Sequence, residues 1–232
     1  MLTAEGISKR FNRNWALKDV SFSAREGEVL GLIGPNGAGK TTLLECLAGL
    51  LPADEGTVKI RDRVTPPARR KREMFYMPDG ILPWADQIVG WALSFFEDLY
   101  AGSRAEVAEL IAPLRLAEIM RARIGSLSKG ERKRTLLALG LVTATDLLLL
   151  DEPFDGLDLR QTRDVMSLLK SHAASGRTLM LSIHQLVDAE RVCDRLVLLS
   201  AGRVAAEGSL AELRAQSGLA EGHLEDIFLA LT

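Results

Sequence analysis

The chain contains few cysteines, histidines and aromatic residues. Its 232 residues include two cysteines, three histidines and two tyrosines, and aromatic residues make up 5% of the total. Cys46 and Cys193 lie far apart and fit neither a disulfide framework nor a metal-binding spacing, so we expect two reduced, buried thiols. Lysine and arginine (29) nearly balance aspartate and glutamate (31), which excludes a global attraction to nucleic acid or to anionic lipid.

Long hydrophobic runs are also missing. No segment reaches the roughly 18 uncharged apolar residues that a membrane-spanning helix needs, and the most apolar stretch, residues 135–150, is interrupted by Asp146. The opening sequence MLTAEGISKRF lacks the pattern of a signal peptide and predicts a strand. We therefore expect a protein that is soluble, or that another component holds at a membrane.

The apolar pattern alternates between strands and helices along most of the chain. Strands are predicted at residues 19–24, 28–34, 57–60, 74–77, 146–151, 177–183 and 195–200, and helices at 40–50, 158–174, 186–193 and near the C-terminus. Residues 61–73, with six basic residues and a Pro-Pro pair, predict a solvated loop, with a patch for a phosphate backbone as the alternative. From about 80 to 126 the pattern is helical, at 91–100 and 103–120, which indicates a helical lobe inserted into an α/β domain.

The first chemical motif lies between a predicted strand and a predicted helix. GPNGAGKT fits the phosphate-binding pattern G-x-x-x-x-G-K-[ST] in the context that this pattern requires. Small residues allow consecutive backbone N–H groups to surround phosphate oxygens, and the helix N-terminus adds a positive dipole. The predicted nucleotide-binding residues are Gly34, Pro35, Asn36, Gly37, Ala38, Gly39, Lys40, Thr41 and Thr42. Lys40 supplies a charge at the outer phosphates, and the Thr41 hydroxyl is placed to bind Mg²⁺.

The second motif is an apolar strand that ends in two acids, DLLLLDEP. Asp151 is predicted to hold Mg²⁺, and Glu152 to orient or deprotonate the attacking water. Consecutive strand residues point to opposite sides, but the chain already turns at the end of the strand, so both carboxylates can face one site.

The third motif is SLSKGERKR. Ser128 and Glu131 form an S-x-x-E capping box before an apolar run, which predicts a helix start. Gly130 lies inside the first turn, where glycine costs about 1 kcal/mol relative to alanine. A bare helix end with a hydroxyl is suited to an approaching phosphate.

These three motifs together resemble the ATP-binding cassette (ABC) family over nearly the whole chain. The resemblance implies a P-loop NTPase (RecA-like) core with an antiparallel β subdomain, in a single domain of residues 1–232 with its helical lobe at about 80–126. LSKGE is similar to the family's LSGGQ signature, with Lys129 and Glu131 as departures, and similar forms occur in drug- and antibiotic-exporter branches. In the family this helix end completes the ATP site of the other subunit, which implies that Ser128 and Gly130 contact a nucleotide held by a partner.

The resemblance implies further site residues. His184 resembles the switch histidine that contacts the γ-phosphate, and DGLD, ending at Asp158, resembles the loop that crosses the dimer interface. Phe11 resembles the aromatic residue that stacks on adenine, with Trp15 as the rival and a core role as the alternative for either. Asp79 stands where the family usually has glutamine, and still offers oxygen to Mg²⁺ although it is one methylene shorter.

The function that the resemblance implies is ATP hydrolysis in a head-to-tail dimer, of two copies or of this chain with a related ATPase. Separate membrane-spanning subunits would dock on the helical lobe, where Trp84, Trp91, Phe95 and Phe96 cluster and packing within the lobe is the alternative. The protein would then lie on the cytoplasmic side of the membrane, and the tail LEDIFLALT favours export.

Two other classes compete with the transporter interpretation. A soluble ABC-type ATPase acting on nucleic acid or the ribosome usually has long insertions or two cassettes in one chain. The segment between Lys40 and Ser128 is too short for such an insertion. A small-molecule P-loop kinase would lack the signature and the switch histidine. No nucleic-acid partner is therefore expected.

Overall fold

A six-stranded sheet forms the centre of the molecule. The computed structural model describes residues 1–100, 104–219 and 221–232. The strand order is β10-β9-β3-β8-β7-β6, and neighbours are parallel except for β9 and β10. The strands are β3 (Val29–Ile33), β6 (Met74–Met77), β7 (Leu147–Asp151), β8 (Thr178–Ile183), β9 (Arg195–Ser200) and β10 (Arg203–Gly208). The predicted α/β class with a P-loop core is confirmed.

The apolar strands separate two hydrophobic cores. In β7, Leu148 and Leu150 point into one core, while Leu147 and Leu149 point into the other. All four are buried, as expected for a strand covered on both faces. The sheet is therefore fixed from both sides, and its strand ends form a rigid edge on which a site can be built.

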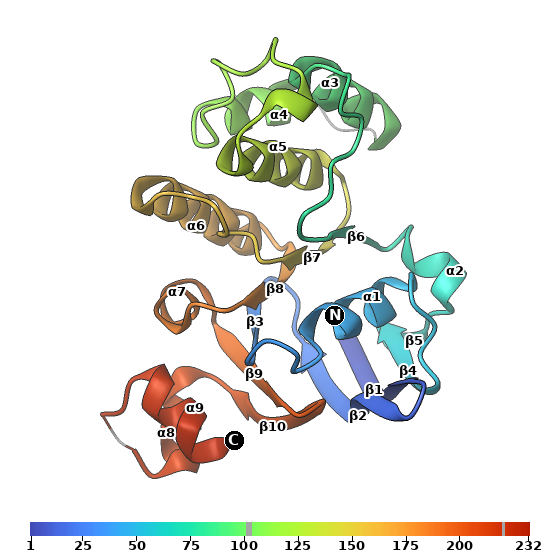
Figure 1. Cartoon of the computed structure of the whole chain (residues 1–232), viewed down its shortest axis with the longest axis vertical. Helices are drawn as coiled ribbons and strands as arrows, with labels where there is room; N and C mark the ends of the chain where they lie inside the picture. Colours follow the sequence, from blue (N-terminus) through green and yellow to red (C-terminus); the bar gives the residue numbers. More distant parts are fainter. Residues whose placement is uncertain (101–103, 220) are drawn as a thin grey trace.

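A four-stranded antiparallel sheet covers one of these cores. Its order is β2-β1-β4-β5, with β1 (Leu2–Phe11), β2 (Asn14–Ala24), β4 (Glu55–Ile60) and β5 (Arg63–Val64). Helix α1 (Lys40–Ala48) packs with this sheet against the central one (Figure 1). The predicted antiparallel β subdomain is confirmed.

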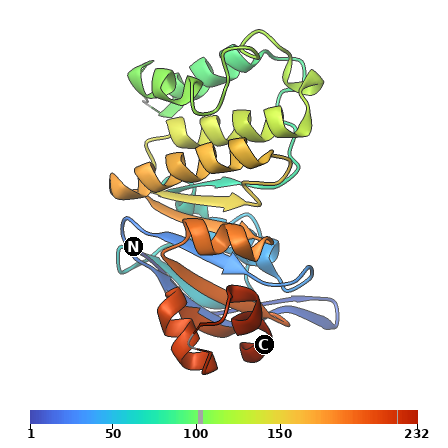
Figure 2. The ribbon, with the colours of Figure 1, turned by 90° about the vertical axis from the view of Figure 1, so that its left-hand side faces the viewer.

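The helical lobe lies on the opposite side of the central sheet. It contains α3 (Val89–Tyr100), α4 (Arg104–Ile111) and the short 3₁₀ helix η1 (Ile124–Ser126). Helix α5 (Lys129–Val142) runs beneath them, with α6 (Leu159–Ala174) beside it (Figures 1 and 2). No helix of the described ranges is long and apolar enough to cross a membrane.

Three sequence predictions differ from the structure. The helix predicted over 103–120 ends at Ile111, because Pro113 lacks a backbone N–H and Arg115 has a left-handed backbone (φ 49°). The predicted first residue of this helix, Ser103, lies outside the described residues. The loop predicted over 61–73 contains β5 and a helical turn, α2 (Pro67–Arg70). A proline suits the first turn of a helix, and buried Arg70 anchors this turn by donating to the carbonyl oxygen of Cys46 (2.6 Å).

The third difference is a missed strand, β10. The Ala-Gly turn before it has positive φ at both Ala201 (46°) and Gly202 (76°), the conformation that joins two strands in a tight hairpin. The sequence analysis predicted the strand before this turn but not the strand that returns from it.

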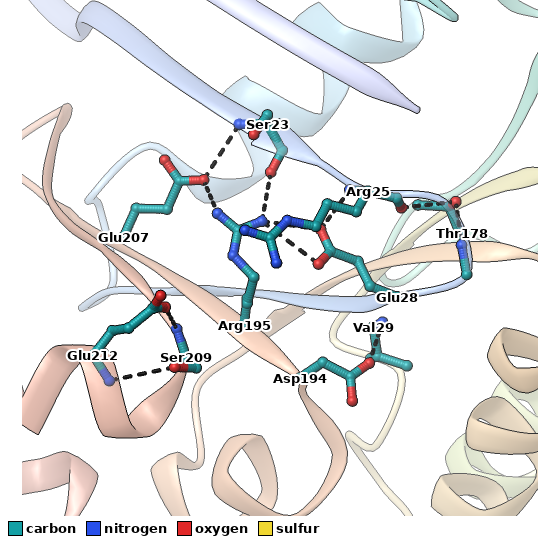
Figure 3. A network of polar contacts seen from close by, with 11 residues as sticks. Ser23, Arg25, Glu28, Val29, Thr178, Asp194, Arg195, Glu207, Ser209 and Glu212 are labelled. Atoms are coloured by element: carbon teal, nitrogen blue, oxygen red, sulfur yellow. Dashed lines mark hydrogen bonds and ion pairs between the residues drawn. The ribbon is translucent and has the colours of Figure 1, made fainter.

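A buried arginine joins the central sheet to the antiparallel sheet (Figure 3). Arg195, at the start of β9, donates to Glu28 Oε1 (3.2 Å), to Glu207 Oε1 (2.5 Å) and to the Ser23 carbonyl oxygen (3.1 Å). These partners come from the segment before β3, from β10 and from β2, so one guanidinium connects three parts of the fold. Helices α7 (Leu186–Val192), α8 (Leu210–Ser217) and α9 (Leu224–Leu231) complete the chain on this side.

Candidate nucleotide site

The phosphate-binding loop connects β3 to α1, as the motif predicts. Gly39 has φ 104°, and a Cβ on it would lie 2.6 Å from the Ala16 carbonyl oxygen, so only glycine fits there. The buried ammonium of Lys40 donates to the carbonyl oxygens of Gly34 (2.7 Å) and Pro35 (3.4 Å). Lys40 therefore holds its charge inside the curve of the loop, where phosphate oxygens would lie.

A cleft of about 340 Å³ opens beside this loop. Its lining includes the predicted residues Pro35, Asn36, Gly37, Gly39, Lys40, Thr41, Thr42, Asp79, Asp151 and Glu152. A second opening, lined by Gly34, Pro35, Asn36, Glu152, Asp155 and His184, adjoins it. Ala38 lines neither, because its side chain is buried and its backbone N–H donates to the Pro35 carbonyl oxygen (3.1 Å).

The first acid of the second motif, Asp151, lies at the end of β7, where it is 2% exposed in the wall of the cleft. Asp151 Oδ2 accepts a hydrogen bond from Thr41 Oγ1 (2.9 Å), which joins the two motifs directly. Asp151 Oδ1 accepts from Ser182 Oγ, and Tyr76 OH lies 3.5 Å from Oδ2. The pKa of Tyr76 is raised, chiefly by burial and then by the neighbouring Asp151 carboxylate.

Sequence reasoning missed Ser182 and Tyr76. The parallel register pairs Asp151 with Ser182, so the hydroxyl faces the carboxylate across the sheet. The available signal was a hydroxyl near the C-terminal end of an otherwise apolar strand. Whether this hydroxyl reaches the carboxylate depends on which strand pairs with β7, and a single sequence does not give the strand order.

The second acid, Glu152, sits at the turn itself. Its backbone is left-handed (φ 49°), and its N–H donates to Ser182 Oγ (3.0 Å). Its Oε2 atom lies 2.6 Å from Nδ1 of His184, which follows β8. The turn thus places both carboxylates on the cleft, as expected for the end of the strand, and brings the predicted base and the predicted histidine together.

The Asp79 side chain lines the same cleft from the loop after β6. Its Oδ1 atom accepts a hydrogen bond from Lys133 Nζ (2.7 Å), and the lysine side chain is only 4% exposed. The sequence prediction named Asp79 but did not find its lysine partner, which lies on α5.

Ser128 and Gly130 do not line this cleft. Ser128 caps α5 in the predicted way: its Oγ accepts from Glu131 N (3.3 Å), and its own N–H donates to Glu131 Oε2 (2.8 Å). A Cβ on Gly130 would lie 2.6 Å from the Gly156 carbonyl oxygen. The chain's own fold therefore requires this glycine, whether or not a phosphate also approaches it.

Two other predicted residues lie apart from the phosphate loop. Asp158 caps α6, with its Oδ1 accepting from Gln161 N (2.9 Å). Phe11 and Trp15 are 47% and 41% exposed, so neither is a core aromatic. Ala16, next to Trp15, lines the cleft.

The donor set suits Mg²⁺ bound together with phosphate. Thr41, Asp151 and Asp79 offer a hydroxyl and two carboxylates on one cleft. Among the residues that the structure describes, no three histidine, cysteine or acidic side chains form a protein-only metal cage. Mg²⁺ at phosphate sites needs only one or two carboxylates, because substrate phosphates and water supply the other oxygens.

The fold and this cleft define a class: a P-loop domain that binds a nucleoside triphosphate. A family model described as "ABC transporter" matches residues 17–155. The Nod factor export ATP-binding protein I of Burkholderia orbicola (strain AU 1054) is 37% identical over 213 residues, 88% of this chain and 69% of that protein. The chain belongs to the ABC transporter family, as an ATP-binding cassette.

Solved structures support the same assignment. A structure described as the ATP binding subunit of an ABC transporter has a TM-score of 0.91 and 29% identity, over 100% of this chain and 99% of that one. The structure of a bacterial Atm1-family ABC exporter with ATP bound has a TM-score of 0.82 and 26% identity, over 94% of this chain and 40% of that one.

Proposed function

We propose that this chain is the ATP-hydrolysing subunit of a membrane exporter. One observation supports this proposal most strongly: five predicted site residues line two adjoining openings at the C-terminal ends of neighbouring strands. These residues are Lys40, Thr41, Asp151, Glu152 and His184. Lys40 would bind the outer phosphates, and Thr41, Asp151 and Asp79 would hold Mg²⁺, which neutralises phosphate charge when bound. Glu152, held by His184, is placed to take a proton from the attacking water.

The dimer is part of the proposal. Ser128 and Gly130 do not line the cleft of their own chain, and the N-terminus of α5 carries the positive end of a helix dipole. In a head-to-tail pair, each α5 would face the nucleotide bound by the partner's Lys40, with Asp158 near the interface. Two copies of this chain, or this chain and a related ATPase, would satisfy the geometry.

An exposed group of aromatic residues supports a membrane partner. Trp91 and Phe95 stack on α3 with their ring centroids 5.2 Å apart, and Trp84 packs edge-on against both. These three residues are 39–41% exposed, whereas Phe96 beneath them is buried. Packing within the lobe therefore accounts for Phe96 but leaves the other three rings available to a cytoplasmic segment of a separate membrane subunit, which would hold the chain at the membrane.

The transport direction that we propose is export, and the name of a relative supports it. Export is in the name of the relative that is 37% identical. The tail 224–232, which contains α9, resembles the end of exporter ATPases, and we propose export for this reason.

The test is recovery of the tagged chain from detergent-solubilised native membranes, with mass spectrometry of co-purifying proteins. We expect a polytopic membrane protein in stoichiometric amount. Trp91→Glu should lose it, whereas Trp15→Glu, an equally exposed tryptophan outside the lobe, should keep it. Recovery only in the soluble fraction, with ribosomes or nucleic acid, would contradict the transporter role.

A further inference from the structure

The two carboxylate oxygens of Asp79 differ in their contacts with the residues that the structure describes. Oδ1 accepts from Lys133 Nζ (2.7 Å). Within the described ranges, Oδ2 has no hydrogen-bond partner. Because Asp79 lines the cleft with Thr41 and Asp151, the free oxygen belongs to a side chain that already borders the proposed metal position.

Burial shows which partner depends on the other. The Lys133 side chain is 4% exposed, and that of Asp79 is 41% exposed. A buried ammonium needs a counter-charge, because desolvation of an unpaired charge is expensive. A half-exposed carboxylate can be solvated by water instead. Lys133 therefore depends on Asp79 for charge compensation. Because Lys133 is part of helix α5 and Asp79 lies in a loop, the ion pair in turn holds the Asp79 loop in place.

The same helix makes a second contact with the site, one turn earlier. Lys129 Nζ lies 2.5 Å from Asp155 Oδ2, and positions i and i+4 share one face of a helix. The pKa of Asp155 is lowered, chiefly by its hydrogen bond to Lys129. Asp155 closes the turn after Glu152, with its N–H donating to the Glu152 carbonyl oxygen (3.2 Å). One face of α5 thus holds an acid on each of the two adjoining openings.

We propose that Lys133 is a positioning residue for the metal of the bound nucleotide: by fixing Oδ1 of Asp79 it leaves Oδ2 for Mg²⁺. The inference rests on the proposed function. Aspartate is one methylene shorter than the family's glutamine, and an anchored carboxylate gives up less freedom when it binds a metal. Ligating carboxylates are commonly held by such outer partners, whose loss weakens metal binding about 10- to 100-fold.

The test separates metal-dependent from metal-independent nucleotide binding. We would measure ATP affinity by calorimetry in the Glu152→Gln background, once with saturating Mg²⁺ and once with EDTA. Lys133→Met should weaken binding about tenfold with Mg²⁺ and by less than about twofold with EDTA. Lys133→Arg should restore most of the loss. Lys59→Met, the control, breaks the ion pair of Lys59 with Glu5 (2.6 Å), which lines neither opening, and should change neither value.

A double-variant cycle checks that the effect passes through Asp79. Asp79→Asn combined with Lys133→Met should bind Mg²⁺-ATP no more weakly than Asp79→Asn alone. Equal losses with and without Mg²⁺, no loss at all, or losses that multiply in the double variant would overturn the inference. If the Glu152→Gln parent binds no ATP under either condition, the proposed function falls, and the inference with it.

Discussion

Nδ1 of His184 lies 2.6 Å from Oε2 of Glu152, across the ends of two adjacent strands. Glu152 is in a left-handed turn and is 19% exposed at its side chain, whereas the His184 side chain is 46% exposed. The imidazole thus contacts the carboxylate through Nδ1, and His184 also lines the opening beside the phosphate loop. This arrangement gives the proposed base a single orientation toward the phosphate loop.

Removal of the imidazole tests that orientation. His184→Ala should lower the ATP turnover number about 10²- to 10³-fold, because a general base contributes in that range only when it is positioned. ATP affinity should change by less than the turnover number, since Lys40 and the loop backbone remain. Steady-state phosphate release and equilibrium binding measure the two quantities. Unchanged turnover would show that His184 does not orient Glu152.

Ser182 forms hydrogen bonds with both acids, Asp151 and Glu152, and its removal should weaken Mg²⁺ binding. Its hydroxyl donates to Asp151 and accepts from the Glu152 N–H. Ser182→Ala should raise the Mg²⁺ concentration needed for half-maximal ATPase activity about tenfold, as is typical for outer-shell partners. Ser171→Ala is the control, because the Ser171 hydroxyl donates to the Leu168 carbonyl oxygen within α6 (2.8 Å), away from the site. The same Mg²⁺ requirement in both variants would rule out this role.

The buried ion pair of Arg195 with Glu28 should contribute strongly to the free energy of unfolding. Arg195→Met leaves Glu28, whose side chain is 8% exposed, without its counter-charge. Breaking a buried pair in this way costs about 3–5 kcal/mol. Arg115→Ala breaks an ion pair with Asp164 whose side chains are 45% and 44% exposed, and should cost about 1 kcal/mol or less. Urea unfolding compares the two; equal costs would contradict the role of Arg195.

Substitution of each exposed ring, Phe11 and Trp15, tests which of the two stacks on adenine. Phe11→Ala should weaken ATP binding about tenfold, because stacking of a base on an aromatic ring is worth about 1–3 kcal/mol. Trp15→Ala should leave affinity nearly unchanged. The opposite result would assign the contact to Trp15, next to the cleft residue Ala16. Since both rings are exposed, neither variant should lower stability greatly, and a thermal melt controls for this.

The parts of the site that sequence predicts are those encoded in short segments. The phosphate loop, the acids at the end of β7 and the Ser128 capping box each lie within a few residues, so local backbone rules define them. Ser182, Lys133 and Arg195 were missed because their roles depend on strand order and on packing between distant segments. Gly130 shows the same limit: its contact with Gly156 joins the starts of two helices far apart in sequence.

The central claim is that ATP joins two cassettes and hydrolysis separates them, and light scattering on the Glu152→Gln variant tests it most directly. The variant keeps the phosphate loop but lacks the proposed base, so ATP should remain bound. With ATP and Mg²⁺ we expect a dimer, and without nucleotide a monomer. Lys40→Ala in the same background should stay monomeric in both conditions. A Glu152→Gln variant that binds ATP with Mg²⁺ and remains monomeric would contradict the proposed homodimer. If it also remains monomeric after addition of a related ATPase subunit from the source cell, the head-to-tail dimer itself would be contradicted.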